Sequence, residues 1–453
     1  NTLMPSLSNF DEIYGFLNSK FENEKEYLQA VHEVLEDIVP IYNANSAYKQ
    51  ADVVRRLCLP ERVIYFTISW VNSEGRVEVN QGWRVQHNGA MGPYKGGLRF
   101  HPTVNLSVLK FLAFEQSFKN ALTGLPMGGG KGGSDFNPKG RSDRDIMLFC
   151  QAFMRELQRH IGANTDIPAG DINVGAREIG YMYGEYRRLN NKFEGVLTGK
   201  GLEFGGSYVR TEATGYGLIY FTESVCKANN TELNGKRVVV SGAGNVALHA
   251  AQKAIQKGAS VVTLSNSRGL LYCEEGFSEA DITWAIKHHT ASDNILVELE
   301  KRGAGVWYSE KTPWHIKCDI ALPCATQNEL HESNARELLK NGCSMVLEGA
   351  NMPCSMEAQE VFINKKITYV PGKASNAGGV ALSGLEMSQN AMFSQRSAHI
   401  LDKELQSIMQ GIHERCIEEA KLLSSKDGYI NYMKGANIAA FRRLADAMVA
   451  QGV

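Results

Sequence analysis

Hydrophobic positions in the first part of the chain recur at two different spacings. Between residues 9 and 48, large apolar side chains such as Val31 and Val34 recur at helical spacing with charged residues between them, which predicts helices. Residues 63–71 are rich in β-branched and aromatic side chains, and residues 76–85 alternate in the same way after a turn. These two runs predict a pair of strands.

A glycine-rich segment lies between two further predicted helices. The hydrophobic periodicity predicts a helix over 105–122 and another over 142–160, with Ser142 as the N-cap of the second. Residues 124–133 between them are predicted to be a loop. Residues 98–100, which precede the first of these helices, are predicted to be a short strand.

The second half of the chain alternates short apolar runs with helical segments. The apolar runs that we interpret as strands are 238–240, 261–264, 319–322, 345–347 and 368–370. Such alternation is typical of a parallel sheet with helices on both faces. We therefore expect an α/β protein with a first domain over 1–205, a doubly wound Rossmann-type domain over 206–375, and helices over 376–453.

Composition narrows the classes of partner. The hydrophobic fraction is 43%, and 48 basic residues against 49 acidic ones give a net charge of -1. This balance predicts neither a nucleic-acid nor a membrane partner, and no segment has the length and apolarity of a membrane span. The nine cysteines include no C-x-x-C pair, which indicates a reducing, cytoplasmic location and no metal site. The N-terminus has no secretory signal pattern.

A strand followed by a glycine turn predicts dinucleotide binding. Residues 238–240 lead into Gly242-Ala243-Gly244-Asn245-Val246-Ala247, a Gly-x-Gly-x-x-Ala pattern. Gly242 permits a tight turn, and Gly244 allows the backbone to approach a pyrophosphate. The N–H groups at the start of the helix that begins at Val246 then face the phosphates. The alternative is a tight turn in an unrelated α/β domain.

The end of the next strand favours NADP over NAD. An NAD site usually has an acidic residue there, and this chain has Ser265 and Arg268 instead. Ser265 can donate a hydrogen bond to a 2′-phosphate, and Arg268 can neutralise it. The alternative is that Arg268 is an exposed turn residue and that NAD binds without the usual acid.

Lysines in glycine-rich or helical settings predict an anion site in the first half. Lys95 precedes two glycines, Gln116 and Lys119 lie on one helix face, and Lys131 stands among glycines, where burial and neighbouring charge would tune it for proton transfer. Residues 168–171 are predicted to present the Asp171 carboxylate on a turn. Each lysine could instead be a solvated surface charge, and Asp171 could instead cap a helix that begins near residue 174.

The Lys131 segment is not a phosphate-binding P-loop. That pattern requires a glycine at position 125 and a serine or threonine at 132, where this chain has Leu125 and Gly132. ATP hydrolysis is therefore not expected.

The chain resembles the hexameric glutamate dehydrogenases of similar length. The segments that carry this resemblance are 92–100, 126–133, 168–171, 175–178, 212–217 and 376–380. They extend over nearly the whole chain, so the implied fold is a substrate-binding and oligomerisation domain, a Rossmann-type domain, and C-terminal helices that return to the first domain.

The resemblance implies how a dicarboxylic amino acid is held. Lys95 and Ser383 would bind the side-chain carboxylate, and Lys119, Gln116 and Asn376 the α-carboxylate. Dehydrogenases for apolar amino acids lack the lysine and serine at these two side-chain positions. A buried lysine would reject an apolar side chain because its charge would have no partner.

It also implies the catalytic and cofactor residues. Lys131 would activate the water that attacks the imine, Asp171 would carry protons to and from the amine, and the Gly170 carbonyl would orient that amine. Thr214 and Asn245 would contact the cofactor.

Asn351 would then lie near the nicotinamide ribose. The expected reaction interconverts glutamate with 2-oxoglutarate and ammonium by hydride transfer with NADP(H), in a cleft between the two domains and in a homohexamer, in the direction of ammonium assimilation. Residues 385–402 lack the long insertion of the animal enzymes, so regulation through that element is not expected. Two alternatives remain: a dehydrogenase for another amino acid, or a non-catalytic dinucleotide-binding protein.

Overall fold

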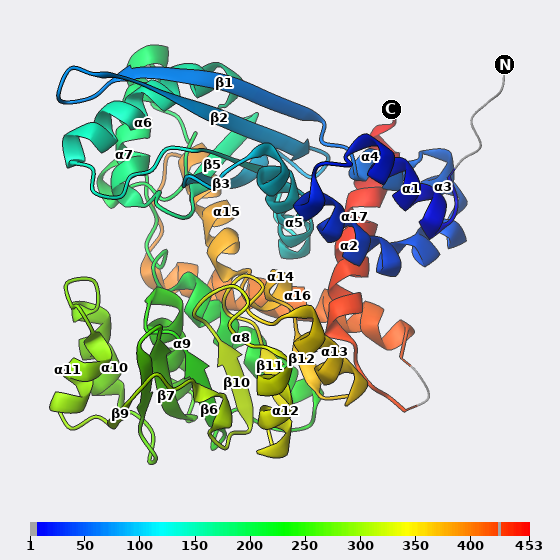
Figure 1. Ribbon diagram of the computed structural model, residues 1–453. Helices are drawn as coiled ribbons and strands as arrows, with labels where there is room; N and C mark the ends of the chain where they lie inside the picture. Colours follow the sequence, from blue (N-terminus) through cyan, green and yellow to red (C-terminus); the bar gives the residue numbers. More distant parts are fainter. Residues whose placement is uncertain (1–6, 425–426) are drawn as a thin grey trace. The chain divides into compact units, whose positions relative to one another are not determined.

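Two β-sheets, each with its own helices, organise the chain in the computed structural model, which describes residues 7–424 and 427–453 (Figure 1). The chain divides into two compact units, and most contacts between residues lie within one unit or the other. The first unit contains residues up to 208 together with 381–398 and 437–453, and the second contains 209–380 and 399–436. The C-terminal segment that we expected to pack on the first domain is therefore divided between the two units.

The sheet of the first unit mixes antiparallel and parallel strands. Its strands are β1 (Arg62–Val71), β2 (Val77–Asn88), β3 (Tyr94–Phe100), β4 (Gly129–Ser134) and β5 (Asp166–Gly170). Their spatial order is β1-β2-β4-β3-β5, with β1, β2 and β4 paired antiparallel and β3 parallel to both β4 and β5. The predicted hairpin is therefore present, and β4 and β5 are additions to the prediction.

The helices of the first unit pack around this sheet. They are α1 (Phe10–Lys20), α2 (Lys25–Ala44), α3 (Ser46–Gln50), α4 (Val53–Leu57), α5 (Leu106–Thr123), α6 (Asp143–Leu157) with the 3-10 turn η1 (Gln158–His160), α7 (Ala176–Asn190), η2 (Leu202–Phe204), and most of α15 (Gly378–Ala391) and α17 (Tyr432–Gln451). Ser142 caps α6 as predicted, since its side chain accepts a hydrogen bond from the Asp145 N–H at 3.2 Å. An aromatic core packs α6 on the sheet, where Phe136 and Phe149 stack with ring centroids 3.9 Å apart.

The prediction of a loop over 124–133 is wrong for its second half. Residues Gly129–Ser134 form β4, a fully buried strand in the sheet. A Cβ atom on Gly129 would come within 1.9 Å of the Ser117 hydroxyl, and one on Gly96 within 1.6 Å of the Gly130 carbonyl oxygen. The glycines are therefore needed for close packing, and because they lack side chains they leave no hydrophobic alternation to mark a strand.

The second unit contains the predicted parallel sheet. Its strands are β6 (Arg237–Ser241), β7 (Ser260–Asn266), β8 (Gly269–Tyr272), β9 (Val306–Ser309), β10 (Ile320–Pro323), β11 (Met345–Leu347) and β12 (Thr368–Val370). In the order β12-β11-β10-β6-β7-β8-β9, the first five strands are parallel, at the predicted positions. Strands β8 and β9 extend the edge in antiparallel pairing, which the prediction did not include.

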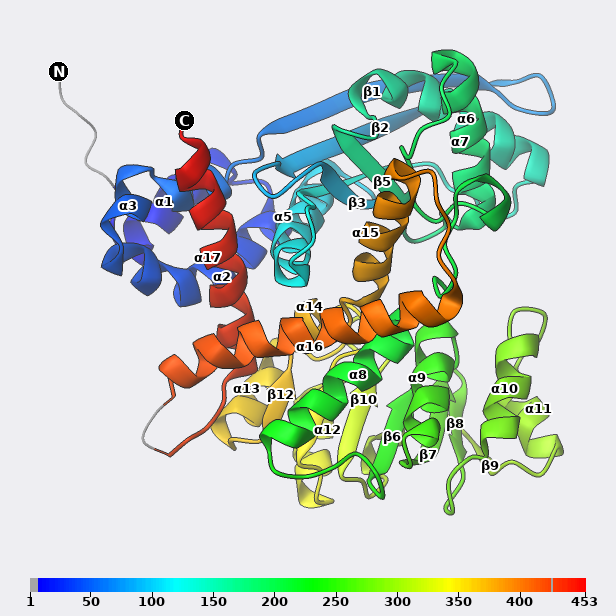
Figure 2. The same ribbon diagram turned by 180° about the vertical axis from the view of Figure 1, so that it is seen from behind.

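Helices lie on both faces of this sheet, as Figures 1 and 2 show. They are α8 (Ala213–Ala228), α9 (Asn245–Gln256), α10 (Glu279–His288), α11 (Ile295–Lys301), η3 (Pro313–His315), α12 (Glu332–Lys340), α13 (Met356–Asn364), α14 (Gly372–Ser375) and α16 (Ala398–Leu422). Helix α16 crosses α8, where the Tyr220 hydroxyl donates a hydrogen bond to Asp402 at 2.6 Å (Figure 2). Within residues 7–424 and 427–453, no helix is long and apolar enough to cross a bilayer.

Candidate active site

Lys131 and Asp171 form an ion pair in the first unit. The Lys131 Nζ lies 3.0 Å from Asp171 Oδ1, and both side chains are largely buried. Lys131 lies on β4, and Asp171 follows directly after β5. Asp171 does not cap the next helix, because α7 begins at Ala176 and its N-cap is Gly175. The alternative structural role that the sequence left open for Asp171 is therefore wrong.

Arg99 completes this cluster, and the sequence did not single it out as a site residue. Its Nε donates a hydrogen bond to Asp171 Oδ2 at 2.6 Å, so the carboxylate lies between two cations. Burial alone would raise the pKa of Asp171, but Lys131 and Arg99 together hold it well below its usual value. Asp171 is therefore ionised at neutral pH.

The two lysines nearest this carboxylate are tuned toward proton exchange. Burial lowers the pKa of Lys131; Asp171 opposes this shift, and the charge of Arg99 adds to it. Lys119, on α5, is half-buried, and burial together with the positive charge of Lys131 lowers its pKa to about 8. An amine whose pKa approaches the working pH can both give and take a proton.

Gln116 and Asn120 lie on the same helix as Lys119. The Gln116 Nε2 donates a hydrogen bond to Asn120 Oδ1 at 2.6 Å. Asn120 in turn donates to the Lys95 carbonyl oxygen at 3.1 Å and to that of Gly128 at 2.6 Å. This buried amide therefore connects α5 to the start of β3 and to the residue that precedes β4, and so fixes the helix that carries Lys119 to the strands that carry the other lysines.

Lys95 and Ser383 are brought together through Thr198. Lys95, which is 1% exposed, donates hydrogen bonds to the Ile167 carbonyl oxygen at 2.8 Å and to Thr198 Oγ1 at 2.7 Å. Thr198 donates to Ser383 Oγ at 3.3 Å. Lys95 is thus not a solvated surface charge. Only the short Thr-Gly-Lys-Gly run at 198–201 marked Thr198 in the sequence, and that signal is weak.

The strand–turn–helix of the second unit has the shape of a pyrophosphate cradle. Gly242 has a φ of +92°, and a Cβ atom there would lie 2.9 Å from the Cys324 carbonyl oxygen. A Cβ atom on Gly244 would meet no protein atom within 4 Å, so packing does not require this glycine. Asn245 and Val246 then begin α9, whose N-cap makes no side-chain hydrogen bond. The backbone is therefore open to an anion at the helix N-terminus.

The strand β7 ends in polar groups that already have protein partners. Ser265 is buried, and its hydroxyl accepts a hydrogen bond from the Gly242 N–H at 3.1 Å. The Arg268 guanidinium lies 3.0 Å from the carboxylate of Asp293, a residue that is distant in sequence and almost fully exposed. An acidic group is therefore present beside Arg268, although the strand itself supplies none. The sequence prediction did not include Asp293.

Gly170 ends β5 in the first unit, and the predicted residues Asn376, Asn351 and Thr214 lie in the second unit. The Asn376 side chain donates hydrogen bonds to the Ala350 carbonyl oxygen at 3.1 Å and to Asn351 Oδ1 at 2.9 Å. Thr214 lies in the first turn of α8, and a Cβ atom on Gly379 would come within 2.6 Å of its hydroxyl. The structure thus brings Asn376 together with Asn351, and Thr214 together with the 376–380 segment.

The chemistry available is that of a buried acid–base pair beside an anion-binding subsite. Lys131 and the ionised Asp171 lie 3.0 Å apart, and Lys119 adds a second amine of lowered pKa. In residues 7–424 and 427–453, no group of three or more His, Cys, Asp or Glu side chains could hold a metal ion.

Comparison with known proteins points to one family. The model described as "Glutamate/Leucine/Phenylalanine/Valine dehydrogenase" matches residues 205–452, and the model "Glu/Leu/Phe/Val dehydrogenase, dimerisation domain" matches residues 60–188. The chain is 52% identical to the NAD-specific glutamate dehydrogenase of Bacteroides fragilis over 446 residues, which cover 98% of this chain and all of the relative.

Two further comparisons cover the chain as fully. The NADP-specific glutamate dehydrogenase of Escherichia coli is 50% identical over 449 residues, 98% of this chain and all of the relative. The solved structure of Plasmodium falciparum glutamate dehydrogenase 2 matches with a TM-score of 0.94 and 48% identity, and the match covers 100% of this chain and 98% of that one.

Proposed function

Because the chain belongs to the family of glutamate, leucine, phenylalanine and valine dehydrogenases, we propose that it interconverts glutamate with 2-oxoglutarate and ammonium, with NADP(H) as its preferred cofactor. The observation that carries the choice of glutamate is the burial of Lys95 against Thr198 and Ser383. A carboxylate at the end of the substrate would complete this polar group. An apolar side chain could accept no hydrogen bond from Lys95, Thr198 or Ser383, so it would be bound less well than a carboxylate.

The proposed chemistry assigns the protein groups as follows. A bound nicotinamide dinucleotide supplies the hydride acceptor, and the residues that would hold its phosphates are Gly242, Gly244 and the start of α9. Lys131, as the free amine, removes a proton from the water that attacks the imine carbon. Asp171, as the carboxylate, accepts a proton from the substrate ammonium group before hydride transfer and returns it to the nitrogen as that nitrogen departs.

Lys95, Thr198 and Ser383 hold the side-chain carboxylate, and Lys119 with Gln116 the α-carboxylate. The carbonyl oxygen of Gly170, at the end of β5, accepts a hydrogen bond from the substrate amine. Fixed donors at both ends of a dicarboxylate orient its Cα, which is the contribution that positioning makes to the rate.

A substrate panel tests this assignment. Turnover is measured with 2-oxoglutarate and with 2-oxo acids of leucine, phenylalanine and valine, each with ammonium and NADPH or NADH. We expect 2-oxoglutarate to be the preferred acceptor by a large factor. Preference for an apolar 2-oxo acid would move the chain to another activity of the family, and absence of turnover with every acid would indicate a non-catalytic protein.

Substrate affinity is expected to fall as the pH rises above about 8. In the free protein Lys119 has a pKa of about 8, and a bound carboxylate would favour the charged amine and raise that pKa. Below pH 8 the lysine is already protonated, so affinity is constant. Above it, binding takes up one proton, and Kd rises by up to about tenfold per pH unit. Calorimetry with 2-oxoglutarate in buffers of different ionisation enthalpy measures this uptake, and Lys119→Gln should abolish it.

The preference for NADP rests on the charge of Arg268. Relatives specific for NAD and for NADP are about equally similar to this chain, so the family alone does not choose the cofactor. The Arg268 side chain is about half exposed and can meet a 2′-phosphate, while Asp293 offers a carboxylate to ribose hydroxyls at the same place.

Replacing Arg268 by alanine is expected to weaken NADPH binding more than NADH binding, because only NADPH carries the phosphate. Asp293→Ala is the matched control, and it should strengthen NADPH binding by removing a repulsive charge. Fluorescence titration of both cofactors gives the two dissociation constants. Equal weakening of NADPH and NADH in Arg268→Ala would remove the basis for the NADP preference.

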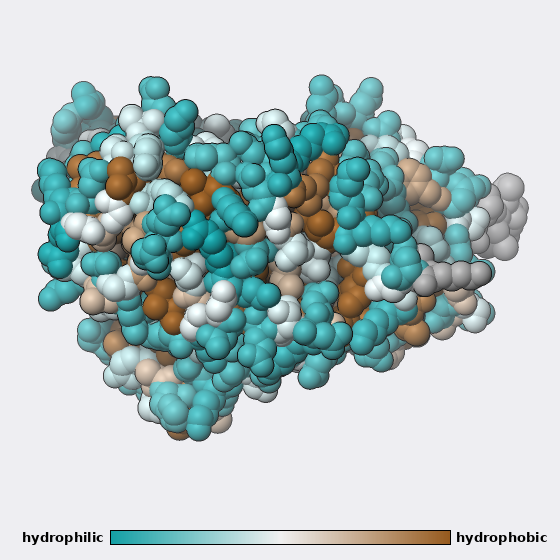
Figure 3. All heavy atoms as spheres, turned by 90° about the horizontal axis from the view of Figure 1, so that it is seen from below, coloured by the Kyte–Doolittle hydropathy of each residue, from teal (hydrophilic) through white to brown (hydrophobic). Residues whose placement is uncertain are grey.

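We further propose that the chain forms a homo-oligomer, a hexamer as in similar enzymes, through the hairpin of β1 and β2. One face of this hairpin exposes apolar side chains, with Tyr65 56% exposed and Val77 71% exposed. In contrast, the face drawn in Figure 3 is mostly hydrophilic, with hydrophobic residues in small patches. The match to a dimerisation-domain model over 60–188 includes the hairpin. Light scattering after size-exclusion chromatography measures the assembly.

A further inference from the structure

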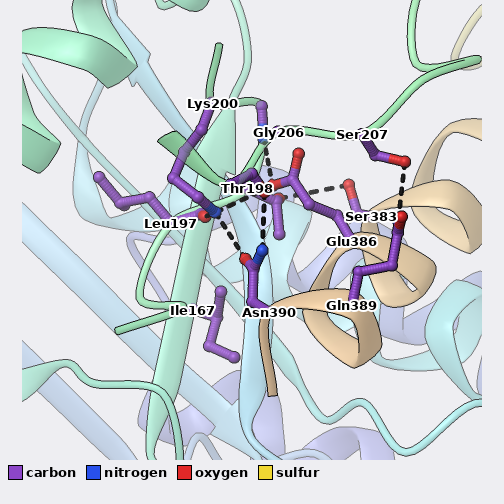
Figure 4. A network of polar contacts seen from close by, with 12 residues as sticks. Ile167, Leu197, Thr198, Lys200, Gly206, Ser207, Ser383, Glu386, Gln389 and Asn390 are labelled. Carbon is purple, nitrogen blue, oxygen red and sulfur yellow. Dashed lines mark hydrogen bonds and ion pairs between the residues drawn. The ribbon is translucent and has the colours of Figure 1, made fainter. Parts of the chain in front are cut away.

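A buried ion pair lies next to the residues that we assign to the substrate side chain. Lys200 Nζ and Glu386 Oε2 are 3.2 Å apart, and each side chain is only 1% exposed. Lys200 follows Thr198 by two residues, and Glu386 follows Ser383 by three on α15. Figure 4 shows the pair between the segment that carries Thr198 and the helix that carries Ser383.

The segment around Thr198 is held at several points by this pair. Lys200 Nζ also donates hydrogen bonds to the Leu197 carbonyl oxygen and to Asn390 Oδ1, the latter at 2.7 Å. Glu386 Oε2 also accepts a hydrogen bond from the Gly199 N–H at 2.9 Å. The residues on both sides of Thr198 are therefore fixed by the same two charges.

Helix α15 contacts Thr198 and Lys200 with side chains from one of its faces. Ser383, Glu386 and Asn390 are separated by three and four positions, the spacing that places side chains on the same side of a helix. Glu386 and Asn390 contact Lys200, and Ser383 contacts Thr198. The ion pair and the hydroxyl pair thus join the same two chain segments, so a shift of one pair moves the other.

Stability alone does not explain this arrangement. A buried ion pair is often no more stabilising than apolar residues of the same volume. In addition, Glu386 Oε1 is buried without a hydrogen-bond partner in the described part of the chain, which costs stability. What the pair supplies is a fixed geometry between a loop and a helix that lie far apart in sequence.

We propose that Lys200 and Glu386 are positioning residues that set the selectivity for a dicarboxylic substrate by holding the Thr198 and Ser383 hydroxyls in register with Lys95. This inference rests on the proposed function. Neither charge is assigned a contact with the substrate. With the pair broken, the two hydroxyls would no longer be held together, and the side-chain carboxylate would lose part of its fixed set of donors.

The test uses Glu386→Gln and Lys200→Met in the full chain. Steady-state kinetics are measured with 2-oxoglutarate and with 2-oxopentanoate, which has the same chain length and no second carboxylate. We expect KM for 2-oxoglutarate to rise by about tenfold or more in each variant. The KM values for NADPH and ammonium should stay unchanged, and the preference for 2-oxoglutarate over 2-oxopentanoate should fall. The double variant should be no worse than the poorer single one, because the two residues act as one unit.

Two further variants separate positioning from folding. Lys110→Met breaks another lysine–carboxylate pair, since Lys110 is 4% exposed and lies 2.6 Å from Glu24, and it should lower the melting temperature without changing selectivity. Asn390→Ala removes a neutral partner of Lys200, along with the hydrogen bond that Asn390 donates to the Gly205 carbonyl oxygen, and should give a smaller rise in the KM for 2-oxoglutarate. This variant keeps the test usable if Lys200→Met does not fold.

The outcomes distinguish this inference from the proposed function. If the parent protein does not turn over 2-oxoglutarate, the proposed function fails. If the parent turns it over and Glu386→Gln lowers only the melting temperature, with selectivity and KM as in the parent, the pair is purely structural and the positioning role is overturned.

Discussion

Replacing Lys131 by alanine is expected to lower kcat by about 10²–10⁴-fold, the range typical for loss of a general acid–base group. The reason is that Lys131 is the buried amine that lies 3.0 Å from Asp171, and its lowered pKa favours the free amine, the form that takes a proton from water. Single-turnover and steady-state assays with 2-oxoglutarate, ammonium and NADPH measure the loss.

The control for this variant is an exposed lysine in the same part of the chain. Lys139 lies in the loop after β4, and Lys139→Ala should leave kcat unchanged. Cofactor binding should be unaffected in both variants, because neither lysine is assigned a cofactor contact. A Lys131→Ala protein with the kcat of the parent would contradict the assigned role.

Replacing Lys95 by methionine is expected to reduce kcat/KM for glutamate by about 10⁴-fold, the scale on which hydrogen-bonded recognition discriminates. Methionine has a similar length but no charge, so the substrate carboxylate would be buried beside Thr198 and Ser383 without a cation. For the same reason norleucine, an apolar substrate, should be used better by the variant than by the parent.

The companion variant for this prediction is Ser383→Ala, which removes one hydroxyl and keeps the charge. It should reduce kcat/KM for glutamate much less than Lys95→Met does, and it should leave norleucine a poor substrate. A Lys95→Met protein that still prefers glutamate by the parent factor would show that this lysine does not recognise the side-chain carboxylate. A dehydrogenase activity on an apolar amino acid would then again be an alternative to the proposed function.

The hydrophobic pattern along the sequence was sufficient to predict the main elements of the second unit. The five parallel strands and the strand–turn–helix at Gly242 and Gly244 could be predicted because each depends on residues close together in sequence. The prediction did not include strands β8 and β9, which pair antiparallel at the sheet edge; β9 is mostly exposed, so it has no buried apolar run that would mark it. The fold class was confirmed by the match to solved glutamate dehydrogenase structures.

The site in the first unit was predicted only as a set of candidates. Lys95, Lys131 and Asp171 were identified from their neighbours in sequence, and the structure adds Arg99 to Asp171 and Thr198 to Lys95. Arg99 lies 72 positions from its partner and Thr198 103 positions from Lys95. No periodicity connects such pairs, because their contact depends on which strands are adjacent in the sheet.

The sequence by itself therefore determined the strand–turn–helix at Gly242 and Gly244, the parallel sheet and the identity of the charged residues, because these follow from backbone preferences and local spacing. Only the tertiary structure decided that the glycine run of β4 is a buried strand and that Lys200 and Glu386 fix Thr198 to Ser383. The physical reason is that glycines carry no side-chain pattern, and that an ion pair between segments far apart in sequence depends on how those segments pack.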